Sequence, residues 1–96
     1  MASLTFDRSA ALTAENSRTI AGGVNSNFRL GMQGGPLVFT HGEGPYLFDA
    51  DGNRLIDYYC GMGATGLGPT PSQVISAVQE QVAKGILYAG QSAVEF

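Results

Sequence analysis

The chain is poor in several residues that would support other classes of protein. It has 96 residues, with no tryptophan, a single cysteine (Cys60), a single histidine (His41) and only five Lys and Arg residues. One cysteine cannot form an internal disulfide, and one histidine without thiol or imidazole companions predicts no metal site. Because the net charge is −3 and the basic residues are scattered, no surface that neutralises phosphates is expected. We therefore predict no nucleic-acid partner.

Long apolar runs are missing as well. None approaches the roughly 20 residues needed to span a bilayer, so no membrane association is predicted. Residues 1–8 have neither the basic start nor the apolar centre of a secretory signal. Together with the lone cysteine, this pattern indicates a reduced, cytoplasmic setting.

Glycine, by contrast, is abundant and the chain is rich in loops. Glycine accounts for 14 of the 96 residues, and apolar residues for 44%. A chain this short buries a modest share of its surface, so its stability alone should be marginal. We expect it to depend on a partner or on the rest of a longer chain.

The first half of the sequence predicts a helix followed by a small sheet. Residues 5–20 favour a polar helix that stops at Gly22 and the glycine after it. Residues 37–58 favour three antiparallel strands, of which the last two form a hairpin. The hairpin turns at Asp51-Gly52-Asn53, where glycine supplies the positive φ that a tight connection needs.

The second half predicts a glycine loop and a second helix. Four glycines lie within 60–68, and a helix is expected over 70–85. Thr70 is the expected N-cap, Pro71 the first helical residue, and Gln73 the partner in a capping box. Val74, Val78 and Val82 give this helix an apolar face. The predicted fold class is therefore α+β.

Three stretches of this sequence form motifs in a fixed order and spacing. The first is Gly-Gly-Val-Asn-Ser-Asn-Phe-Arg at 22–29, the second is the hairpin with its Asp-x-Asp-Gly-Asn-Arg run, and the third is the glycine loop with the helix after it. Together they resemble class III aminotransferases. The likeness covers roughly residue 20 to the end. It is closest to the branch that contains glutamate-1-semialdehyde aminomutase.

The resemblance implies that residues 1–96 form the N-terminal segment of a fold-type I, pyridoxal-phosphate-dependent transferase. This segment would belong to the small domain, and the catalytic large domain would be absent from the chain. The implied partners are the rest of the parent enzyme, a second subunit in a homodimer, and a small-molecule amino donor or acceptor. The implied activity is amino-group transfer on a carboxylate-bearing substrate.

The resemblance also assigns roles to three residues in substrate binding. Arg29 and Ser26 stand where the family holds a substrate carboxylate, and a planar guanidinium suits that task. From residue type alone, an exposed loop arginine is the commoner interpretation of Arg29. Met62 stands where the family places an aromatic pocket wall, and Pro69 replaces a family histidine. Which amino substrate is used, and whether the reaction is a transamination or a mutase reaction, stays open.

Pyridoxal-phosphate chemistry requires a lysine that carries the cofactor. Lys84 is the only lysine in this sequence, and its place at the end of a helix explains it as a solvated residue. We therefore predict no catalytic or cofactor-binding residue in these 96 positions, and no activity of the chain alone. Cys60 is interpreted as a structural thiol because nothing places His41 beside it.

One alternative from a different class is also consistent with the sequence. The chain would then be a small non-enzymatic module that docks on a partner through the 74/78/82 helix face. A cooperative thermal transition of the monomer would favour the module, and a molten or aggregated sample would favour a piece of an enzyme.

Overall fold

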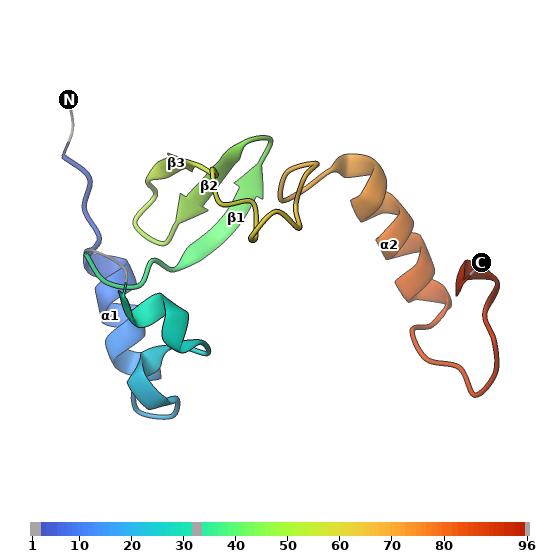
Figure 1. The fold of residues 1–96 in the computed structure, drawn as a ribbon, viewed down its shortest axis with the longest axis horizontal. Helices are drawn as coiled ribbons and strands as arrows, with labels where there is room; N and C mark the ends of the chain where they lie inside the picture. The colour runs from blue at the N-terminus through green and yellow to red at the C-terminus, as the bar shows by residue number, and fades with distance from the viewer. Residues whose placement is uncertain (1–2, 32–33, 96) are drawn as a thin grey trace.

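The computed structural model describes residues 3–31 and 34–95. Within them, the regular elements are α1 (Asp7–Asn16), β1 (Phe39–Glu43), β2 (Tyr46–Asp49), β3 (Arg54–Ile56) and α2 (Ser72–Lys84), with short 3₁₀ turns η1 (Ala21–Gly23), η2 (Asn27–Gly31) and η3 (Ala93–Glu95). Figure 1 shows α1 beside the sheet and α2 beyond the loop that follows it. The predicted α+β fold, with a helix, a three-stranded antiparallel sheet, a glycine loop and a second helix, is confirmed.

The sheet is an antiparallel meander in the order β1-β2-β3. Gly52 has the positive φ expected at the hairpin turn, 83°. The first strand begins at Phe39, two residues later than the sequence pattern suggested. Val38 lies just before the strand, where its amide donates to Ser9 Oγ at 3.3 Å and its carbonyl accepts the amide of Ala50 at 2.7 Å.

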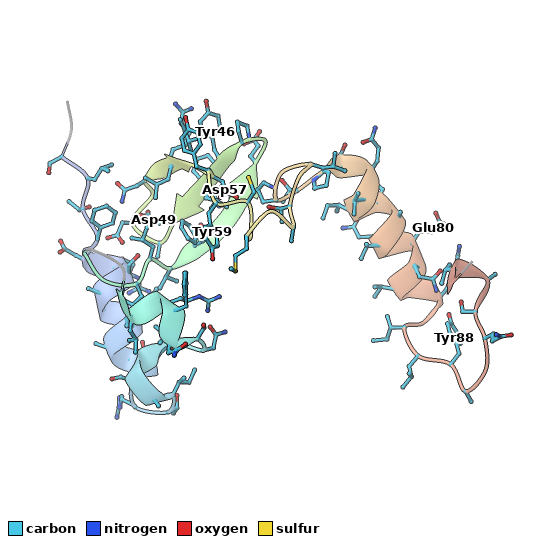
Figure 2. The ribbon with its side chains drawn as sticks, in the orientation of Figure 1. Tyr46, Asp49, Asp57, Tyr59, Glu80 and Tyr88 are labelled. Atoms are coloured by element: carbon cyan, nitrogen blue, oxygen red, sulfur yellow. The ribbon has the colours of Figure 1, made fainter. Side chains whose placement is uncertain are left out.

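A buried carboxylate organises the hairpin turn. Asp49 is only 2% exposed, and its Oδ1 accepts the amides of Asp51 at 3.0 Å and Asn53 at 2.8 Å. Its Oδ2 accepts the side-chain amide of Asn53 at 2.8 Å. Because a buried carboxylate is costly unless it is hydrogen-bonded, these three bonds explain how Asp49 can lie inside the turn. Figure 2 shows Asp49 at this end of the sheet.

The same turn caps α1 from a distant part of the sequence. Phe6, at the N-cap position, makes no side-chain cap, and the first-turn amides of Arg8 and Ser9 donate instead to the two carboxylate oxygens of Asp51, at 2.7 and 2.9 Å. A carboxylate at a helix N-terminus also interacts favourably with the helix dipole. Asn53 adds a bond from its side-chain amide to the Thr5 carbonyl at 2.6 Å. Polar contacts thus hold α1 to the sheet.

The start of α2 differs from the sequence prediction. The helix begins at Ser72 with Pro71 at the N-cap position and no side-chain cap, so the predicted Thr70 capping box is wrong. Thr70 Oγ1 donates to the Gly42 carbonyl at 2.8 Å, which commits its hydroxyl to the sheet. At the other end, the Tyr88 hydroxyl donates to the Lys84 carbonyl at 3.1 Å, and Tyr88 lies within the loop after α2 (Figure 2).

Among the described residues, no hydrophobic side chain is buried. The radius of gyration is 17.1 Å, whereas a compact domain of this length has about 13 Å. Every residue of α2 except Gln81 is exposed, including Val74, Val78 and Val82. Within the same ranges, neither helix has the length and apolarity needed to cross a bilayer. The chain therefore has ordered elements without a core that encloses them.

The capping carboxylate should make α1 sensitive to acid. Desolvation raises the pKa of Asp51, but hydrogen bonds from the backbone amides of Arg8 and Ser9 and from the Ser9 side chain outweigh it and leave the pKa below its ordinary value. A lowered pKa means that docking is favoured above the ordinary pKa of Asp and is lost as the pH falls through the lowered value. The amide NMR shifts of Arg8 and Ser9 should titrate with that low midpoint. An Asp51→Asn variant that shows the same titration would contradict this.

Candidate substrate-binding segments

Ser26 and Arg29 lie in one tight segment between α1 and the sheet. Arg29 belongs to η2, and its amide donates to the Ser26 carbonyl at 3.1 Å. Ser26 is exposed and lines an open hollow of about 490 Å³. The wall of the hollow is mostly apolar and includes Ile20, Val24 and Leu30. A polar residue at the edge of an apolar hollow is a common arrangement in ligand sites.

The guanidinium of Arg29 is held by a neighbouring side chain. Its Nη1 donates to Oδ1 of Asn25, four residues earlier. Arg29 is exposed, and a guanidinium has five N–H donors, so this bond orients the group while leaving most donors facing solvent. Asn25 was not among the predicted site residues. The i, i+4 spacing of Asn25 and Arg29 was the signal that would have indicated it.

The glycine loop after β3 is built on a second aspartate. Asp57 Oδ1 accepts the amides of Tyr59 at 3.1 Å and Cys60 at 2.9 Å, and the Cys60 thiol donates to the Asp57 carbonyl at 3.3 Å. Cys60 is half-buried, so its interpretation as a structural thiol fits this bonding. The aspartate thereby bends the chain away from β3 and into the loop.

Four consecutive residues of this loop, from Cys60 to Gly63, adopt left-handed backbone angles. Their φ values are 49°, 58°, 62° and 88°. Two of them, Cys60 and Met62, are not glycine, so their side chains bear a steric cost there. Met62 is also 78% exposed. Strained, non-glycine residues of this kind occur where surrounding structure fixes a loop for function.

The loop then closes against the sheet at a second open hollow of about 290 Å³, which Asp57, Cys60 and Pro69 help to line. Pro69 lies so close to Gly42 that a Cβ there would stand 2.3 Å from the proline Cγ. Only glycine therefore fits at position 42. Pro69, where the family usually has a histidine, serves here as a packing residue.

The three predicted site residues do not form one site within the described chain. Ser26 and Arg29 share a segment, but the described hydrogen bonds do not connect that segment to Met62. Met62 also lines neither of the two hollows. A pocket that uses all three residues would therefore need groups beyond those described.

Lys84 does not fit a covalent cofactor site. Its side chain is 61% exposed, and its Nζ pairs with Oε1 of Glu80 at 2.6 Å, one helical turn away. A cofactor lysine needs a desolvated amine, whereas this one faces solvent and is paired with a carboxylate. The surroundings of Lys84 therefore do not fit a lysine that carries pyridoxal phosphate as an imine.

Comparison with solved structures shows that the fold of this chain is similar to part of several transaminases. No family model matches the sequence. The chain superposes on a transaminase with PLP bound with a TM-score of 0.87 and 25% identity, over 97% of this chain and 22% of that one. It matches a β-phenylalanine aminotransferase from Variovorax paradoxus (TM-score 0.73, 30% identity, 90% and 20% coverage). A glutamate-1-semialdehyde-aminomutase from Pseudomonas aeruginosa PAO1 shares the fold (TM-score 0.80, 24% identity, 90% and 19% coverage).

The chain thus has the fold of a segment of a pyridoxal-phosphate-dependent transaminase. More closely, the fold is that of class III aminotransferases, as the sequence resemblance predicted. The chain spans about a fifth of the length of the structures that it matches. The transaminase of the first comparison has PLP bound, and PLP is the cofactor that the sequence resemblance implied for the family.

The left-handed backbone at Met62 can be tested by substitution. Met62→Gly should stabilise the loop by about 1 kcal/mol, because glycine has no steric cost at φ 62° and loses only part of that gain through added freedom of the unfolded chain. Hydrogen exchange of the Thr65 amide, which donates to the Cys60 carbonyl at 2.9 Å, measures the change. Met62→Leu keeps the strain and serves as the control. Equal exchange rates in both variants would show that the loop does not adopt this conformation.

Proposed function

We propose that the chain is part of a class III, pyridoxal-phosphate-dependent aminotransferase or aminomutase, and that it supplies the substrate end of the pocket. The likeness to a transaminase over 97% of this chain supports the enzyme family most directly. The setting that we propose is cytoplasmic, which the single, free thiol of Cys60 supports.

Arg29 is the residue that we assign to a substrate carboxylate. Asn25 holds one guanidinium nitrogen, and the rest of the planar fork is exposed, so two parallel charge-assisted hydrogen bonds to a carboxylate remain possible. The Ser26 hydroxyl, exposed three residues away, would donate a third bond. Met62 would provide an apolar wall that adapts to the substrate, since methionine is flexible.

The cofactor lysine and the cover of the pocket would come from the rest of the enzyme and from a second subunit. Eighteen large hydrophobic residues of the described chain are exposed, and so many without a core favour an extensive partner surface. The alternative, an independent module that docks through Val74, Val78 and Val82, gains support from the same exposed face. It has less support as a self-sufficient unit, because a module needs its own buried core.

The cofactor assignment leads to a direct test on the 96-residue chain. Mixed with pyridoxal phosphate, the chain should give no stoichiometric imine absorption, because the Lys84 amine is solvated and paired with Glu80. Borohydride reduction followed by mass spectrometry should find no labelled Lys84 beyond the level of free lysine. A Lys84→Arg variant provides the background. A stoichiometric adduct on Lys84 that this variant lacks would overturn the assignment.

The assignment of Arg29 is tested in the complete enzyme that contains this chain. Arg29→Lys should weaken binding of a carboxylate-bearing substrate by about 1–3 kcal/mol, because an ammonium cannot make the two-pronged contact. The comparison of affinities for a substrate with and without its carboxylate isolates this term. Arg18→Lys, an exposed arginine outside the segment, is the matched control. Unchanged discrimination between the two substrates would remove Arg29 from the site.

A further inference from the structure

The turn that caps α1 contains the single Asp-Gly bond of the sequence, Asp51-Gly52. Asp-Gly bonds are prone to isomerise in flexible chains, because glycine places no side chain in the way of ring closure. The backbone nitrogen of the glycine attacks Cγ of the protonated aspartate side chain, and one carboxyl oxygen leaves as water that carries the carboxyl proton and the amide proton. The resulting succinimide is then opened by water. Cleavage on one side restores aspartate, and cleavage on the other gives isoaspartate of unchanged mass.

Both reacting groups of this bond are occupied in the folded chain. Each carboxylate oxygen of Asp51 accepts a first-turn amide of α1, from Arg8 at 2.7 Å and from Ser9 at 2.9 Å. The attacking nitrogen, that of Gly52, donates its proton to the Asp49 carbonyl at 3.1 Å. The leaving oxygen is thus kept ionised and directed to the helix, while the nucleophile is hydrogen-bonded elsewhere.

We propose that Asp51-Gly52 is a modification site that forms isoaspartate, and that the docking of α1 protects it from isomerisation. Isomerisation moves the main chain through the side-chain carbon of Asp51 and adds one methylene to the turn. The carboxylate that remains is then attached directly to Cα, where it no longer reaches both amides of α1. One modification would therefore remove the two hydrogen bonds by which the turn caps α1, leaving the contacts of Ser9 with Val38 and of Thr5 with Asn53, and this loss would not reverse spontaneously on refolding.

The site is tested by ageing the 96-residue chain at neutral pH and quantifying isoaspartate at position 51 by electron-transfer fragmentation. A synthetic peptide of residues 46–58, which lacks α1, provides the unprotected rate. The intact chain should isomerise on the order of tenfold more slowly than this peptide, since a hydrogen bond to a charged group is strong enough for such a ratio. Equal rates in chain and peptide would overturn the proposal.

Two variants distinguish the effect of α1 docking on the isomerisation rate at position 51 from the overall rate of chemical ageing of the sample. Arg8→Pro removes one donor in the first helical turn, where proline is tolerated, and should raise the rate at position 51 several-fold. Arg8→Lys keeps the amide and the charge and should leave the rate unchanged. Deamidation at Asn25-Ser26, an exposed pair in a different segment of the chain, serves as the internal clock of each sample. If Arg8→Pro and Arg8→Lys age alike at position 51, the helix does not protect the bond.

Discussion

The buried carboxylate of Asp49 is the constraint on which the N-terminal half of this structure depends. It closes the hairpin turn by accepting the amides of Asp51 and Asn53. In this conformation, the Asp51 carboxylate and the Asn53 side-chain amide both face the segment that contains α1. The Asp51 carboxylate then holds the start of α1, and the Asn53 amide holds the strand of chain before it. The Asp51-Gly52-Asn53 turn thus connects three parts of the chain: the hairpin, the start of α1 and the segment before α1.

The hydrogen bonds of this turn, and not a hydrophobic core, connect α1 to the sheet among the described residues. Directional hydrogen bonds fix where α1 and the sheet lie relative to each other, although no hydrophobic side chain is buried among the described residues. The apolar side chains are left at the surface, among them Val74, Val78 and Val82 on α2. This is the expected state of a segment whose hydrophobic surfaces match partners in a much longer protein, and the solved structures that it resembles are about five times as long.

The sequence predicted the kind and order of the elements better than their connections. Glycine at position 52 and the valine spacing of α2 are local signals, and both were interpreted correctly. The cap of α1 could not be predicted, because Asp51 is more than forty residues away from the amides that it accepts. Thr70 failed as a cap for the same reason, since the Gly42 carbonyl that takes its hydroxyl is distant in sequence. The local partner of Arg29 was accessible in principle, whereas the substrate pocket that we propose would need groups outside this chain.

The contact of Pro69 with Gly42 has a consequence for how the two halves of the chain are oriented. A ring lies directly against bare backbone, and the neighbouring hydroxyl of Thr70 is bonded to the same residue. The direction in which the chain leaves the sheet toward α2 is therefore fixed by the contacts of Pro69 and Thr70 with Gly42 on β1, and not by the sequence of the helix. Substitutions at the exposed positions of α2 should accordingly leave the direction of the helix relative to the sheet unchanged.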